Sequence, residues 1–267
     1  GQVDGKYYAF PYVTNATTVY YRADILEDEL GFTDLDKPVT WEKLFEMCEA
    51  VKNKYNGEVI PFSFCTLDQN SSNAMINVLF SNGTSCVNEE GTGGALDGPK
   101  ALESMEFFTT MKENGYFPEG MVTYNQADLE KLYQSGKVAM VWNAPASHVA
   151  SNEDLMSKTK MMGPIVGPSA DEPRYVMRTG GIMGFAQTKY PEETKEFIEW
   201  FVKNNLGVFT EGHGGLLPLR ESFYEDPFFE TDWEISEYSK YTEYYEDIIW
   251  PSSFSPAATD QILMENI

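Results

Sequence analysis

The sequence is poor in the residues that carry most enzyme chemistry. It has two histidines, His148 and His213, and three cysteines in 267 residues. It contains no HExxH, GxSxG, Walker or GxGxxG motif. Metalloproteases, hydrolases of the nucleophile-elbow type and nucleotide-binding enzymes are therefore not indicated. We predict no catalytic residue, no cofactor and no metal site.

Basic residues and long apolar runs are also scarce. Lys and Arg number 19 against 42 Asp and Glu, which gives a formal net charge of -23. Such an acidic surface repels phosphates and argues against nucleic acid as a partner. The apolar runs fall far short of the roughly 20 residues of a spanning helix. No stretch within the sequence has the pattern of a signal peptide.

Two weaker patterns favour ordinary structural roles. Cys48 lies on an apolar helix face and is predicted to be a core residue. Separate Cys65 and Cys86 thiols are favoured over a disulfide between them, because no CxxC spacing occurs.

The glycine-rich "EGTGGALDG" (90–98) lacks the lysine of a phosphate loop and the spacing of an EF-hand. A solvated turn is favoured there over a calcium site.

What is present is an alternation of strand and helix patterns. Helices are predicted from Thr40 as N-cap through Val51, from Asp97 and Pro99 to Gly115, over 126–136 and over 192–204. Strands are predicted at 58–64, 137–142 and 180–187. The inward stripe of helix 192–204 is predicted to be Phe197, Ile198, Phe201 and Val202. This order predicts an α/β fold with largely parallel sheets.

Four stretches, taken in order, resemble one known family. They are "DGKYYAFPYVTNATTVYYRADIL" (4–26), "VTWEKLFEMCEAVK" (39–52), "LEKLYQSGKVAMVWNAP" (129–145), and "GGIMGFAQTKYPEETKEFIEWFV" (180–202) followed by "GGLLPLRESFYEDPFF" (214–229). Together they are similar to the extracellular solute-binding proteins of ABC sugar importers, in the maltose- and oligosaccharide-binding group. The resemblance implies an α/β fold of the periplasmic-binding-protein type II, with two lobes joined by hinge crossings.

The resemblance also implies where the lobes begin and end. Residues 16–178 with 228–267 would form the second, C-terminal lobe. Residues 1–14 with 180–225 would be the remnant of an incomplete first lobe, with Thr14 and Asn15 at the crossing. Part of the family pattern is expected ahead of Gly1, so the chain is interpreted as a fragment. Its stretches 7–12 and 180–186 are too apolar to be left bare, so they should be covered by self-association or by a separate chain that carries the missing segment.

Ligand contacts follow from the resemblance position by position. They are Tyr12 and Asn15 near the first crossing; Asp68, Gln69, Asn70 and Ser71 in a loop; Trp142, Ala146 and His148 after a strand; Gly180 and Gly181 at the return crossing; and Phe254 and Ser255 in a late stacking region. Three positions depart from the family. Asn15 stands where maltose-binding relatives have a carboxylate, the loop has no aromatic residue, and Ala146 stands where a tryptophan is frequent. For Trp142 the apolar neighbours favour a core role.

The family implies a non-catalytic function. The protein would capture an oligosaccharide and deliver it to ABC permease subunits in the membrane. It would be extracellular, either anchored at the cell surface as a bacterial lipoprotein or periplasmic, with the export signal outside these residues. Three alternatives stay open from the residues alone: a binding protein for a cationic ligand such as a polyamine, a glycoside-active enzyme, and a partner-binding remnant without a ligand.

Overall fold

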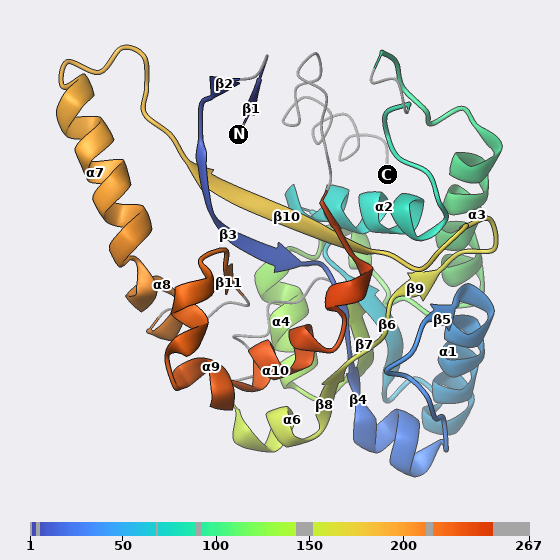
Figure 1. Ribbon diagram of the computed structural model, residues 1–267. Helices are drawn as coiled ribbons and strands as arrows, with labels where there is room; N and C mark the ends of the chain where they lie inside the picture. The colour runs from blue at the N-terminus through green and yellow to red at the C-terminus, as the bar shows by residue number, and fades with distance from the viewer. Residues whose placement is uncertain are drawn as a thin grey trace.

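Two separate four-stranded sheets form the framework of the protein (Figure 1). The computed structural model describes residues 2–3, 6–67, 69–88, 92–142, 152–211 and 216–247. Helices pack around both sheets, which confirms the predicted α/β class. No helix in these described ranges is both long and apolar enough to cross a membrane.

The first sheet has the strand order β11-β3-β10-β12. Its strands are β3 (Phe10–Ala16), β10 (Tyr175–Ile182), β11 (Leu217–Pro218) and β12 (Tyr245–Asp247). The two long strands, β3 and β10, are antiparallel, with Asn15 opposite Arg178 and Pro11 opposite Gly181. The short strand β12 pairs with the beginning of β10, and β11 pairs with Val13 and Thr14 in β3. Among the described residues, the other end of the sheet is built by β3 and β10 alone.

The second sheet has the order β6-β7-β4-β8. Its strands are β4 (Val19–Arg22), β6 (Ile60–Phe64), β7 (Val138–Trp142) and β8 (Thr159–Met161). Only β6 and β7 are parallel, whereas β4 is antiparallel to both of its neighbours. The prediction of largely parallel sheets was therefore wrong. The cause is that β4 follows β3 after only Thr17 and Thr18, so it enters the second sheet at the edge where β6 and β7 end.

The remaining elements surround these sheets. The helices are α1 (Trp41–Tyr55), α2 (Gln69–Ser81), α3 (Pro99–Glu113), α4 (Gln126–Gln134), α6 (Glu153–Ser157), α7 (Pro191–Asn204), α8 (Leu206–Thr210), α9 (Phe228–Thr231) and α10 (Trp233–Ser239). Short strands are β1 (Gln2–Val3), β2 (Lys6–Tyr7), β5 (Val39–Thr40) and β9 (Ile165–Val166). A π-helix, η1 (Asp24–Glu29), and three 3-10 helices, η2 (Met121–Thr123), η3 (Glu221–Glu225) and η4 (Thr242–Tyr244), complete the described elements.

Most predicted elements are present, with two corrections at their ends. The Thr40 hydroxyl accepts a hydrogen bond from the Lys43 amide at 3.3 Å, so the predicted N-cap of α1 is confirmed. The strands β6 and β7 also lie where the sequence predicts them. Asp97 does not cap α3, because Gly98 is the N-cap and Pro99 begins the helix. The strand predicted over 180–187 ends at Ile182 and begins earlier, at Tyr175.

Buried tyrosines fill the space between the two sheets. One hydrophobic cluster joins Tyr20 of β4, Tyr175 of β10 and Tyr238 of α10, and includes Val141 of β7. The Tyr20 hydroxyl donates to the Tyr238 hydroxyl at 3.1 Å, so the buried phenols satisfy each other. This cluster connects the sheets at the point where the chain passes between them.

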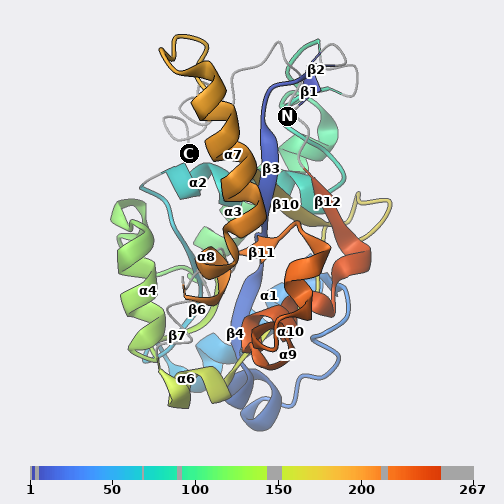
Figure 2. The same ribbon diagram turned by 60° about the vertical axis from the view of Figure 1, so that its left-hand side comes forward.

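Helix α7 does not meet its prediction. None of its residues is buried, and Phe197, which was expected to face the core, is 54% exposed. Ile198, Phe201 and Val202 are only half-buried. Figure 2 shows α7 alongside β3 with no layer of the described chain on its outer side. The helix has the amphipathic pattern of a core helix but lacks the cover that this pattern normally receives.

We predict cooperative alkaline unfolding from the buried tyrosines. Burial is the largest cause that raises the pKa of Tyr20, Tyr175 and Tyr238 well above the usual value of about 10. Their contribution to stability is therefore complete below pH 10 and is lost as pH rises above it, because the unfolded chain releases those protons first. Tyrosinate absorbance and far-UV circular dichroism should change together between about pH 10 and 12.

The control for this prediction is the Tyr20→Phe variant. Above pH 10, its unfolding free energy should fall less steeply than that of the parent protein, by about 1.4 kcal/mol per pH unit. Complete ionisation of the tyrosines with an unchanged dichroism spectrum would contradict the assignment.

Candidate ligand site at the chain crossing

Three strands of the second sheet end side by side, and the row formed by these strand ends is the candidate edge. Phe64 of β6 and Val19 of β4 both pair with Trp142 of β7. The carboxyl ends of β6 and β7 and the amino end of β4 therefore lie side by side. Ligands of α/β proteins bind preferentially at such strand ends. This edge is the candidate site.

The edge also holds the crossing between the sheets. Thr17, directly after β3, donates its amide to the Val176 carbonyl of β10 at 3.0 Å. Helix α2 begins shortly after β6 ends and packs against β10. Loops from both sheets are thus held around one point by backbone hydrogen bonds.

A small enclosed cavity lies beneath this edge. Thr17, Asn77 of α2, Trp142 and Arg174 line it, together with four apolar residues and Ser81. Its volume of about 10 Å³ has room for roughly one water molecule. The cavity is a gap between elements rather than a ligand pocket. Sequence reasoning selected none of its residues Thr17, Asn77, Ser81 and Arg174 as a ligand contact. The sequence signal for Asn77 is a single amide inside the apolar run 74–79.

The indole of Trp142 belongs to the core. It is 4% exposed, and its ring packs edge-on against Phe62 at 6.1 Å and Phe107 at 6.4 Å between centroids. This placement agrees with the core role that its apolar neighbours favoured. An indole buried in this way has no open face on which a sugar ring can stack, so its predicted ligand contact has no support in this arrangement.

The residues predicted from the first sheet lie in different surroundings. Asn15 is half-buried on β3, two residues before Thr17, and so lies close to the crossing. Tyr12 is turned toward α7, where its ring meets Phe201 edge-on at 5.2 Å. The structure therefore brings Asn15 toward the strand edge but not Tyr12.

Local packing between β3 and β10 explains why the two positions predicted to approach a ligand are glycine. Gly180 and Gly181 flank an irregularity in the pairing of β10 with β3. A Cβ atom at Gly180 would lie 2.7 Å from a methyl group of Val13, and one at Gly181 would lie 3.3 Å from the Ala9 methyl. Close strand packing alone thus requires glycine at 180.

Several predicted contacts fall outside the described residues. These are Asp68, Ala146, His148, Phe254 and Ser255. For Gln69, Asn70 and Ser71 the structure gives only their position, at the start of α2 beside the candidate edge. The assignment of these residues to a ligand stays a prediction.

The described edge combines polar side chains with charged ones, among them Arg174 and, opposite Asn15, Arg178. Arg174 is engaged by Glu172 at 3.0 Å and by Glu246 at 3.2 Å, so its charge is already balanced. Burial raises the pKa of the Tyr175 phenol beside it, and the phenol donates to the Met162 carbonyl. No group of three or more metal-binding side chains occurs among the described residues.

Comparison with known proteins places the chain in a family. Residues 1–237 match the family model described as bacterial extracellular solute-binding protein. A putative binding protein of Brucella abortus is 28% identical over 222 residues, which cover 82% of this chain and 52% of that protein. A probable ABC transporter-binding protein of Deinococcus radiodurans is 22% identical over 205 residues, covering 74% and 48%. The chain thus spans about half the length of these relatives.

Solved structures share the fold. A sugar transporter from Arthrobacter chlorophenolicus with bound laminaribiose superposes with a TM-score of 0.80 at 19% identity, covering 96% of this chain and 65% of that one. Maltose-bound MalE3 of T. maritima gives 0.78 at 22% identity, covering 98% and 67%. The fold is that of the two-lobed α/β binding proteins. The chain belongs to the bacterial extracellular solute-binding protein family.

The position of Trp142 generates a stability prediction. Trp142→Ala should lower the free energy of unfolding by about 3–5 kcal/mol, because it empties a packed aromatic site. Leu102→Ala, at a residue 58% exposed on α3, should change it by less than about 0.5 kcal/mol. Urea unfolding monitored by circular dichroism measures both. A Trp142→Ala protein as stable as its parent would show that the indole is not a core element.

Proposed function

We propose that the protein captures an oligosaccharide at the chain crossing and delivers it to the permease subunits of an ABC importer. The observation that carries this proposal is the family match over residues 1–237, combined with an edge where strand ends and a crossing converge. Its relatives carry binding-protein names, and solved neighbours hold laminaribiose and maltose. The protein acts outside the cytoplasmic membrane, at the cell surface or in the periplasm.

The proposed role involves binding without catalysis. A sugar presents hydroxyl groups and apolar C–H faces, so neutral amide and hydroxyl side chains suit it better than charged ones. Asn15 fits this requirement because its amide offers a donor and an acceptor beside the crossing. Lobe closure around the sugar would then present one defined shape to the permease.

The formal charge of -23 supports a second candidate, a cationic ligand such as a polyamine, because an acidic protein attracts cations. Around the described edge, however, two cations are present: Arg174, which Glu172 and Glu246 engage, and Arg178, which lies opposite Asn15. No described carboxylate lines the small cavity at this edge. A ligand without positive charge is therefore favoured.

Calorimetry on the full-length protein tests the proposal. Titration with laminaribiose, maltose and stachyose should give binding to at least one sugar, and titration with spermidine should give none. Chromatography of the sugars after prolonged incubation should recover them intact. Binding of spermidine alone would support the cationic alternative, and steady product formation by repurified protein would make it an enzyme.

The Asn15→Ala variant tests the site itself. Loss of the amide should weaken affinity for the bound sugar by about tenfold or more, because a hydrogen bond to a buried polar group is worth about 1–3 kcal/mol. The matched control is Asn53→Ala, on the exposed face of α1. The affinity of this variant for the sugar should equal that of the parent protein. If both variants bind like the parent, Asn15 is not a ligand contact.

A further inference from the structure

Arginine is rare in this acidic chain, and half of its arginines lie at the candidate edge. The four arginines are Arg22, Arg174, Arg178 and Arg220. Arg22 and Arg220 hydrogen-bond to side chains two residues along the chain, away from the edge. The other two lie on β10 or directly before it. In a protein with a formal net charge of -23, this concentration of positive charge at one place is a local exception.

The two arginines at the edge have different roles. Glu172 and Glu246 engage Arg174, so its charge serves to hold the loop before β10 against β12. Arg178 is half-buried and lies directly opposite Asn15 in the pairing of β10 with β3. Side chains opposite each other in an antiparallel pair have Cβ atoms about 4.5–5.5 Å apart. Arg178 is therefore a neighbour of the amide already proposed to bind the sugar.

The alternation of side chains along β10 places Arg178 on the face of the ligand site. Met177 belongs to the buried tyrosine cluster, whereas Val176 lines the small cavity beneath the edge together with Asn77 of α2. Successive strand residues point to opposite faces, so Arg178 shares the face of Val176. This is the face of β10 against which α2 packs (Figure 1). Arg178 and Asn15 thus lie one step along the strands from the cavity.

The residues around this pair match the chemistry of an acidic sugar. A guanidinium group presents a planar fork that binds a carboxylate through two parallel hydrogen bonds. It has five N–H donors, so contacts with the protein leave others for a ligand. The next pair outward on this face, Val13 and Gly180, is apolar and suits the C–H face of a sugar ring. A neutral sugar would use the amide and this apolar step but would not need the guanidinium.

We propose that the protein selects oligosaccharides that carry carboxylates, as uronic acid units do, and that Arg178 is the residue that selects them. The guanidinium binds the carboxylate of one sugar unit, and the Asn15 amide binds a neighbouring hydroxyl group. This inference rests on the proposed capture of sugars at the chain crossing and adds the substrate class. The rest of this acidic protein repels an anionic ligand, so the preference for it depends on this one cation.

Calorimetry on the full-length protein tests the substrate class. Trimers of galacturonate, mannuronate and guluronate are each compared with their methyl esters, which keep the sugar skeleton and remove the charge. The protein should bind at least one acidic trimer about tenfold or more tightly than its ester, because hydrogen bonds to charged groups are worth more than neutral ones. Laminaribiose and maltose are the uncharged references and should bind more weakly than that trimer.

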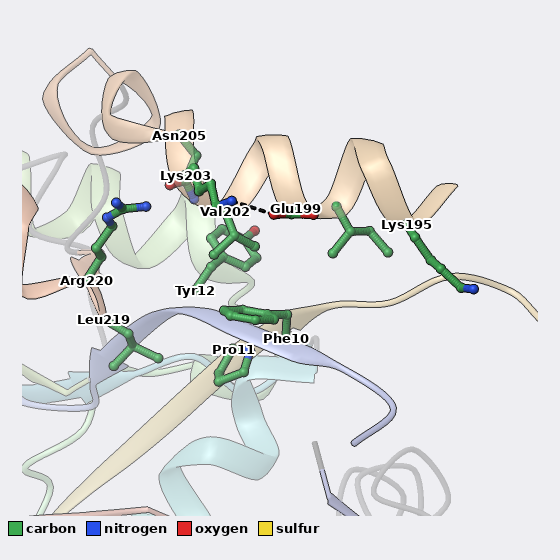
Figure 3. A pocket seen from close by; sticks show the side chains of 11 residues that line it. Phe10, Pro11, Tyr12, Lys195, Glu199, Val202, Lys203, Asn205, Leu219 and Arg220 are labelled. Carbon is green, nitrogen blue, oxygen red and sulfur yellow. Dashed lines mark hydrogen bonds and ion pairs between the residues drawn. The ribbon is translucent and has the colours of Figure 1, made fainter. Parts of the chain in front are cut away.

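Substitutions at position 178 test the residue. Arg178→Gln should bind the acidic trimer and its ester equally, and Arg178→Lys should keep part of the preference, because an ammonium retains the charge but lacks the fork. The matched control is Arg220→Gln, at an arginine that lines a groove between β3 and α7 (Figure 3). This control should keep the full preference. Thermal unfolding of each variant shows whether it is folded.

The outcomes separate this inference from the proposed function. Binding of neutral sugars with equal affinity for acid and ester would overturn the inference and leave the proposed function standing. Binding of none of the sugars, acidic or neutral, would overturn the proposed function and the inference with it. A preference for the acid that persists in folded Arg178→Gln would overturn the role of Arg178.

Discussion

The packing of buried phenol rings between the two sheets is the interaction that holds the crossing in place. Tyr20 belongs to the second sheet, Tyr175 to the first, and Tyr238 to the helix that follows both. The hydroxyl of each ring has a partner, so these large side chains are buried without an unsatisfied polar group. Beside this cluster, the Thr17–Val176 backbone hydrogen bond and the packing of α2 against β10 also join the two halves. The convergence of strand ends at the candidate site depends on that fixed geometry.

Much of the second sheet could be predicted from local sequence. The continuous apolar run of β7 and the capped, periodic pattern of α1 each indicate one structure, because short-range preference and burial agree there. Strand direction could not be predicted in this way. Parallel order follows from helical crossovers, but β4 arrives through a two-residue crossing from another sheet, and no local pattern records that path.

The candidate site was predictable in part. The resemblance placed Asn15 near the crossing, and the structure has it half-buried there, but the same reasoning also selected Tyr12 and Gly180. Tyr12 faces α7, and Gly180 is required by the methyl group of Val13. Neighbouring strand residues point to opposite faces, so nearness in sequence says little about which side chain meets a ligand. Asn77 was missed because a single amide in an apolar helix has no distinctive spacing.

Helix α7 shows most clearly what hydrophobic periodicity in a sequence cannot predict. Its periodicity correctly identifies an amphipathic helix, yet periodicity reports which face needs cover and not whether the cover is present. The two halves of the molecule differ in this respect. The second sheet is enclosed by α1, α3 and a large core that includes Leu44, Phe62 and Phe107, whereas the first sheet leaves Phe10 and α7 open to solvent. Among the described residues, the largest buried core therefore belongs to the second sheet, and the periodicity of α7 alone does not report this difference.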